Sequence, residues 1–190
     1  LWKLKPGGQA GIVLSNGSMS SNTSGEGEIR KAMIEGDVVE IMISLPGQLF
    51  LNTQIPCCLW FLTNDKSKNG RDRRNETLFI DARKLGIMET KVHKVLTSKD
   101  IQKIANTVAS WRKGDSYEDI KGFCKSSTNQ EIEKNSYGLT PGRYVGFEDL
   151  EDDGVPFEKN IKELANNFQR ISEKSLELDK KIQSILKKIG

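Results

Sequence analysis

The fold is decided by residues 37–63, which read DVVEIMISLPGQLFLNTQIPCCLWFLT. Two apolar runs rich in β-branched and aromatic residues, 37–45 and 57–63, flank a loop that opens with Pro46-Gly47. Runs of this length and composition predict buried β-strands. A parallel return needs a longer crossover, so we expect the second strand to run antiparallel and to lie at the edge of the sheet.

The sequence on either side extends this pair into a larger α/β sheet. Residues 9–15 predict a strand, residues 27–36 a short helix that Gly36 ends, and residues 77–82 a further strand. Strand, helix, strand is the pattern of a parallel sheet covered by helices. We therefore expect residues 1–96 to form half of a doubly wound sheet, with the other half before Leu1.

The character of the chain changes near residue 97. Residues 97–112 have a cap at Thr97 or Ser98 and helical apolar spacing, and an irregular segment follows that ends in the acidic stretch 147–154. We treat 97–154 as a helical and irregular connecting region.

The most regular pattern is at the end of the chain, where residues 155–190 predict a long helix for assembly. Apolar residues recur there at steps of three and four over more than four heptads, which indicates a partner helix. The alternative is a helix that lies on its own domain. The apolar positions are Phe157, Ile161, Leu164, Phe168, Ile171, Leu178, Ile182, Ile185 and Ile189.

The bulk composition excludes some classes of protein. The net charge of +3 over 190 residues neither demands nor excludes a polyanionic partner. The three cysteines, with Cys57 and Cys58 adjacent in an apolar run, do not form a disulfide framework and are typical of buried thiols in a cytoplasmic protein. No apolar stretch approaches the roughly 20 residues that span a bilayer, so we expect no membrane partner.

Several blocks of the sequence carry a family resemblance. They are LKPGGQAGIVLSNGSMSS (4–21), residues 27–62, FIDARKLG (79–86), GFCKSST (122–128) and LTPGRYVG (139–146). In this order they resemble the carboxyl-terminal part of the methyltransferase (modification) subunit of type I restriction-modification systems. The resemblance implies the distal part of a Rossmann-like sheet and a complete subunit that transfers methyl from S-adenosylmethionine to the N-6 nitrogen of adenine in DNA.

Two motifs of that family are missing from this chain. They are the glycine-rich cofactor loop and the Asn-Pro-Pro-Phe/Tyr motif, and the sequence contains no Asn-Pro pair at all. The glycines of Gly25-Glu26-Gly27 start a helix instead. We therefore expect the cofactor site to lie mostly outside this chain, and the chain alone to be inactive.

Phe50 is the only aromatic residue of the loop 46–56. An enzyme that methylates a base in duplex DNA flips it out and holds it against an aromatic or apolar face. The resemblance implies that Phe50 stacks on the flipped adenine, with Asn52 and Thr53 positioning the base or its backbone. The alternative is that Phe50 covers the strand ends as a packing residue.

Other candidate residues carry weaker signals. Asn16 follows the first strand, where it either borders the cofactor pocket or makes an ordinary Asn-Gly turn. The loop 66–74 either contacts DNA phosphates or is a solvated turn. We expect Tyr144 to pack against the domain. No spacing of His93 and the cysteines suggests a metal site. The cations of the basic loop are Lys66, Lys68, Arg71, Arg73 and Arg74.

The resemblance also implies partners. Double-stranded DNA is the substrate, a specificity subunit would bind the terminal helix, and a restriction subunit can join. Ile161, Leu164, Phe168, Ile171, Leu178, Ile182 and Ile185 would supply the apolar contact with the specificity subunit. A non-catalytic assembly module that acts only through this helix is the alternative; a methyltransferase for RNA or protein fits the ordered blocks less well.

Overall fold

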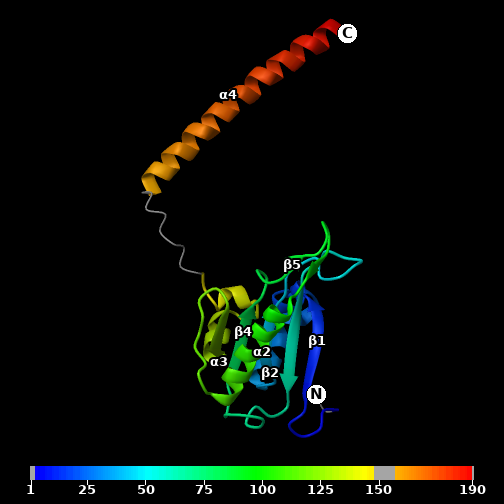
Figure 1. The fold of residues 1–190 in the computed structure, drawn as a ribbon, viewed down its shortest axis with the longest axis vertical. Coiled ribbons are helices and arrows are strands. Elements are labelled where there is room, and N and C mark those ends of the chain that lie inside the picture. The colour runs from blue at the N-terminus through cyan, green and yellow to red at the C-terminus, as the bar shows by residue number, and fades with distance from the viewer. Residues whose placement is uncertain (1–2, 148–156, 190) are drawn as a thin grey trace. The chain divides into compact units, whose positions relative to one another are not determined.

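The computed structural model describes residues 3–147 and 157–189, which contain both strands and helices (Figure 1). The strands are β1 (Gln9–Ser15), β2 (Val39–Ser44), β3 (Cys57–Thr63), β4 (Glu76–Asp81), β5 (Ile87–Met88), β6 (Lys94–Val95) and β7 (Cys124–Thr128). The helices are α1 (Glu26–Glu35), α2 (Ser98–Lys113), α3 (Asn129–Lys134) and α4 (Phe157–Ile189), with short 3-10 helices η1 (Asn16–Met19), η2 (Thr23–Gly25) and η3 (Pro141–Arg143).

Five strands form one mixed sheet in the order β1-β3-β2-β4-β7. Strand β3 runs antiparallel to both β1 and β2, and β2 runs parallel to β4. The antiparallel return of β3 is confirmed, but its predicted place at the edge is wrong, because β3 lies between β1 and β2. The sequence of β3 agrees with an interior place: CCLWFLT is apolar on both faces, as is typical of strands inside a sheet whose two faces are covered.

The strand at the other edge of the sheet was not predicted from the sequence. Strand β7 pairs antiparallel with β4 from Glu76↔Thr128 to Ile80↔Cys124. Its residues CKSST lie in the segment predicted to be irregular, so the connecting region contributes a strand to the same sheet.

Local signals set the helix ends. Gly25 adopts a left-handed φ of 81° immediately before α1, and this is the helix-start role expected for it. Helix α2 begins with a capping box in which Thr97 accepts from the Asp100 amide and the Asp100 carboxylate accepts from the Thr97 amide. Gly114, again left-handed at φ 73°, ends it.

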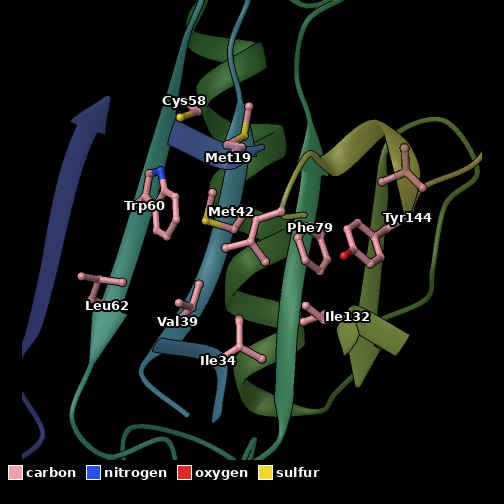
Figure 2. Packing of buried hydrophobic residues seen from close by; sticks show 12 residues of the cluster. Met19, Ile34, Val39, Met42, Cys58, Trp60, Leu62, Phe79, Ile132 and Tyr144 are labelled. Atoms are coloured by element: carbon pink, nitrogen blue, oxygen red, sulfur yellow. The ribbon is translucent and has the colours of Figure 1, made fainter. Parts of the chain in front are cut away.

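Helices cover both faces of the sheet and divide the core into two clusters. On one face Ile34 of α1 and Ile132 of α3 pack against Met42, Trp60 and other strand residues (Figure 2). On the other face Trp111 of α2 packs against a second cluster that includes Ile41, Ile43, Leu78 and Ile80.

Tyr144 packs against the domain, as predicted. Its ring stacks on Phe79 with the centroids 3.8 Å apart and the planes 9° from parallel (Figure 2). Its hydroxyl donates to the Gly138 carbonyl, and burial raises the pKa of Tyr144.

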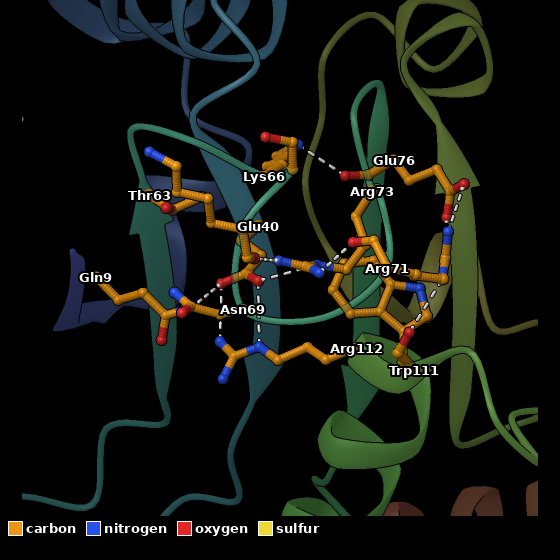
Figure 3. Close-up of polar contacts among 12 residues, drawn as sticks. Gln9, Glu40, Thr63, Lys66, Asn69, Arg71, Arg73, Glu76, Trp111 and Arg112 are labelled. Atoms are coloured by element: carbon orange, nitrogen blue, oxygen red, sulfur yellow. Dashed lines mark hydrogen bonds and ion pairs between the residues drawn. The ribbon is translucent and has the colours of Figure 1, made fainter. Parts of the chain in front are cut away.

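One carboxylate is fully buried at the start of β2. The register of β2 against β3 shifts between Val39 and Ile41, so Glu40 is the extra residue of a β-bulge. A bulge redirects the side chain that it carries, and Glu40, with 0% of its surface exposed, meets cations from two other segments (Figure 3). Arg112 of α2 donates to both of its oxygens at 3.1 and 2.8 Å, and Arg73 Nε lies 3.3 Å from Oε1.

The same cluster extends to β1 and to the basic loop. Gln9 donates to Glu40 Oε2 at 2.9 Å. Arg73, only 1% exposed, also donates to the carbonyls of Arg71 and Lys68, which closes the loop around its guanidinium. Gly70 lets this loop approach α2: a Cβ there would lie 2.1 Å from the Arg112 carbonyl oxygen. Glu40 therefore ties β1, β2, the basic loop and α2 together.

Helix α4 belongs to a second unit, which starts at residue 150. It is a single helix of 33 residues, as predicted, and its described apolar side chains are exposed. Residues 148–154 of the predicted acidic link lie outside the described part of the chain, as do the side chains of Phe157 and Ile189.

We predict that Glu40→Ala lowers the free energy of unfolding by about 3–5 kcal/mol, because it leaves buried guanidinium groups without a counter-charge. The midpoint of urea unfolding, compared between Glu40→Ala and the unmodified chain, would measure this. The matched control is Asp72→Ala, which removes the exposed partner of Arg74 in the same basic loop and should move the midpoint little. Equal midpoints for Glu40→Ala and the unmodified chain would contradict the prediction.

Candidate functional site

Three loops gather at one end of the sheet, where β1, β2 and β4 have their carboxyl ends; we call this end the carboxyl edge. Strands β1, β2 and β4 point the same way, since Ser15 and Ser44 lie opposite Cys57 and Cys58, and Ser44 pairs with Asp81. The turn at Asn16, the loop 45–56 and the segment 82–96 therefore all lie at the carboxyl edge (Figure 1). Open α/β sheets bind ligands at this edge.

Phe50 stands in a tight turn of the loop 45–56. Phe50 and Thr53 form an isolated antiparallel bridge, and the Gln48 amide donates to the Gln54 carbonyl at 3.3 Å. Phe50 is 46% exposed, so nearly half of its surface is accessible and the rest is covered. Asn52 and Thr53 lie beside it and are also exposed, which brings the three predicted base-contacting residues together.

Asn16 begins η1, directly after β1. Its Oδ1 atom is buried and has no hydrogen-bond partner among the described residues. The next turn is held in place because Ser18 donates to the Ser15 carbonyl at 2.8 Å and accepts from Trp60 Nε1 at 3.1 Å. Asn16 stays a predicted border of the cofactor pocket.

The described residues do not by themselves form a cradle for S-adenosylmethionine. Helix η1 follows β1 with the sequence NGSM, and Gly25 and Gly27 belong to the start of α1. Among the described residues, Asn16 Oδ1 is the one buried side-chain acceptor without a partner at this end of the sheet, which fits a pocket border and no more.

The basic loop lies at the opposite end of the strands from Phe50. It connects the end of β3 to the start of β4, so about the length of one strand separates the two loops. Lys66 and Arg73 are buried: Lys66 Nζ lies 2.6 Å from Asp37 Oδ1 and donates to the Glu76 carbonyl at 2.7 Å. Burial lowers the pKa of Lys66, although the bond to Asp37 opposes this. The predicted phosphate contact is therefore corrected for these two residues, which hold the loop to the domain.

The other three cations of this loop have carboxylate partners within the domain. Arg71 pairs with Glu76 through two hydrogen bonds, which lower the pKa of that carboxyl group. Arg74 pairs with Asp72, and its hydrogen bonds lower the pKa of Asp72 to about 2. Lys68 lies 3.2 Å from Asp65. Phosphate contact by Lys68, Arg71 and Arg74 stays a prediction, in which DNA would compete with these carboxylates.

The remaining reactive side chains do not assemble a second site. His93 Nδ1 lies 3.0 Å from Glu89 Oε2, and the pKa of the Cys124 thiol is raised by burial. Burial likewise raises the pKa of Cys57. Among the described residues no three histidine, cysteine or acidic side chains are placed to hold a metal ion. Within the same residues, no helix combines the length and apolar character needed to cross a membrane.

The sequence matches a known family over most of its length. Residues 1–153 match the family described as N-6 DNA methylase. The chain is 48% identical over 190 residues to the type I restriction enzyme HindI methylase subunit of Haemophilus influenzae, covering all of this chain and 42% of that protein. It is 37% identical over 192 residues to the MjaIX methylase subunit of Methanocaldococcus jannaschii, covering 34% of that protein.

Solved structures agree with this match. The type I restriction-modification methyltransferase subunit from Streptococcus thermophilus superposes with a TM-score of 0.59 at 33% identity, over 73% of this chain and 26% of that one. The type I restriction enzyme EcoKI M protein has the same fold, with a TM-score of 0.56 at 13% identity over 91% of this chain and 41% of that chain.

The fold is of the α/β class, with a mixed sheet whose loops gather at its carboxyl edge. The chain belongs to the N-6 DNA methylase family, among the methyltransferase subunits of type I restriction-modification systems. It spans less than half the length of the curated relatives given above.

Proposed function

We propose that residues 1–190 are the carboxyl-terminal part of a DNA adenine N-6 methyltransferase subunit. The complete subunit would transfer methyl from S-adenosylmethionine to a flipped-out adenine, and this part alone would be inactive. The family match over residues 1–153 supports the reaction class. The observation that carries the role of this part is the half-exposed ring of Phe50 at the carboxyl edge of the sheet.

Phe50 would act by binding the base and not by bond making. Flipping a base costs a few kcal/mol of stacking, and a ring that stacks on the extruded base returns about 1–3 kcal/mol. Asn52 and Thr53 carry polar side chains on the same turn and would fix the orientation of the base. Proton transfer and methyl attack would then depend on residues of the complete subunit, with Asn16 at the border of the cofactor pocket.

The edge strand β1 supports a larger, Rossmann-like sheet in the complete subunit. Within the described residues β1 pairs only with β3, and Val13 on it is 55% exposed. Hollows of about 190 and 470 Å³ lie on the two sides of the sheet near β1, lined mainly by apolar residues such as Ile12 and Phe61. A further strand along β1, with helices over both hollows, would cover this surface in the way expected for the missing half of the sheet.

Helix α4 would bind the specificity subunit. Its apolar side chains at heptad spacing are between 50% and 75% exposed, which leaves a stripe that a helical partner would bury. The stripe consists of Ile161, Leu164, Phe168, Ile171, Leu178, Ile182 and Ile185. Double-stranded DNA and a restriction subunit would complete the assembly.

We predict that Phe50→Ala in the complete subunit reduces methyl transfer to DNA by about five- to 150-fold, which corresponds to the loss of one stacked ring. Phe50→Trp should retain activity, whereas Phe50→Leu, which keeps apolar volume without an aromatic face, should not. Methylation of duplex DNA with labelled cofactor measures this. Phe147→Ala is the matched control, because Phe147 is 92% exposed and lies outside the loop. Full activity of Phe50→Leu would show that the side chain only packs.

We also predict that Ile171→Gln, Leu178→Gln and Ile182→Gln together abolish co-purification with the specificity subunit, because polar groups would replace the apolar contact. The control carries Asn166→Gln, Glu173→Gln and Lys180→Gln, which lie on the opposite side of the helix and should leave binding intact. Circular dichroism of both triple variants checks that the helix is kept. Retained binding by the first variant would overturn the interface.

A further inference from the structure

An exposed apolar projection extends from the carboxyl edge of the sheet. It consists of the loop 45–56 and the β5–β6 hairpin, residues 86–95, which lie at the same end of the molecule (Figure 1). Leu51 is the most exposed of its apolar side chains, at 85%. Patches of this kind on a protein surface mark sites of interaction. The exposed apolar residues are Phe50, Leu51, Ile55, Ile87, Met88 and Val92.

The two parts of the projection are joined and ordered. The Lys94 amide donates to the Gln48 carbonyl at 2.8 Å, which fixes the hairpin beside the turn that carries Phe50. At the tip of the hairpin, Thr90 Oγ1 accepts from the amides of Val92 and His93 at 3.3 and 3.0 Å. At its base Gly86 has φ 87°, and a Cβ there would lie 2.9 Å from the Val95 carbonyl oxygen. A preorganised tip loses little conformational entropy when it binds.

The charge of the projection favours a polyanion. The loop 45–56 contains no charged residue. In the hairpin Lys91 and Lys94 are accompanied by a single acid, Glu89, whose carboxylate lies 3.0 Å from the His93 ring. Lys91 stands at the exposed tip, next to Val92. Apolar side chains flanked by lysines are the combination with which proteins enter the base stack of DNA while they contact its phosphates.

We propose that this projection enters duplex DNA beside the target adenine. Lys91 and Lys94 neutralise phosphates, and Leu51 and Val92 contact the bases that flank the position from which the adenine has left. The inference rests on the proposed function, because a flipped base leaves a gap in the stack that apolar side chains can fill. In this arrangement Phe50 would contact the flipped base, while the neighbouring apolar side chains of the same projection would fill the gap that the base left in the stack.

Fluorescence anisotropy of the complete subunit with its specificity subunit tests the phosphate contacts. The probes are fluorescein-labelled 30-base-pair duplexes of mixed sequence, intact or with one central abasic site. Lys91→Gln with Lys94→Gln should weaken binding to both duplexes by about tenfold to a hundredfold at 0.1 M salt and reduce the salt slope by about two. The matched control is Lys99→Gln with Lys113→Gln, two exposed lysines of α2, which should change neither quantity.

The apolar contacts have a separate readout. The unmodified complex should prefer the abasic duplex, and Leu51→Ala with Val92→Ala should reduce that preference at least fivefold without changing the salt slope. Unaltered thermal melting would exclude misfolding, and Lys91→Arg with Lys94→Arg should restore duplex affinity.

Two results would overturn the inference, and neither depends on methyl transfer. The first is duplex affinity that is the same for the lysine variant and its control. The second is that the lysine variant or the Leu51→Ala, Val92→Ala variant no longer co-purifies with the specificity subunit but keeps its DNA affinity. The projection would then be a protein interface. Failure of the Phe50 experiment with intact anisotropy results would instead refute the role of Phe50 in the proposed function and leave this surface in place.

Discussion

The buried carboxylate of Glu40 is the constraint on which the rest of the domain depends. A charge this deep in the sheet is stable only when it is paired and hydrogen-bonded, and Arg112, Arg73 and Gln9 meet that requirement together. Each partner comes from a different segment, so forming the cluster fixes α2, the basic loop and β1 relative to β2. The bulge that turns Glu40 toward them is the local distortion that makes the pairing possible.

The two ends of the strands consequently differ in the side chains that they present. At the end where the basic loop follows Thr63, ion pairs and a close approach at Gly70 hold the chain against α2. At the carboxyl edge, loops project with apolar side chains exposed. The proposed site for an extruded base would need such accessible groups on a rigid support, and the ion-paired end of the domain would supply that rigidity.

Much of the fold could be predicted from the sequence. Four of the five strands of the main sheet, the first two helices and the long terminal helix follow from hydrophobic period and caps such as Thr97. The position of β3 and the existence of β7 could not be predicted in the same way: one depends on which neighbours cover an apolar strand, and the other is a polar edge strand without apolar alternation. For the site, the role of Phe50 follows from the family resemblance and stays a prediction, whereas the hairpin at 86–95 gave no periodic signal because its two strands have two residues each. The burial of Lys66 and Arg73 was missed because a cationic run does not show which carboxylates compensate it.

Three exposed apolar surfaces remain, and their patterns distinguish what each would bind. On β1 the apolar residues accompany a backbone edge without a strand partner among the described residues, and strand pairing satisfies both features. On α4 they recur at heptad spacing, a pattern that the proposed partner helix would match along its length. On the projection they are irregular, stand at loop tips and have lysines beside them. Neither a strand nor a helix offers a regular match to that arrangement, whereas the proposed DNA partner would offer phosphates to the lysines and base faces to the apolar tips.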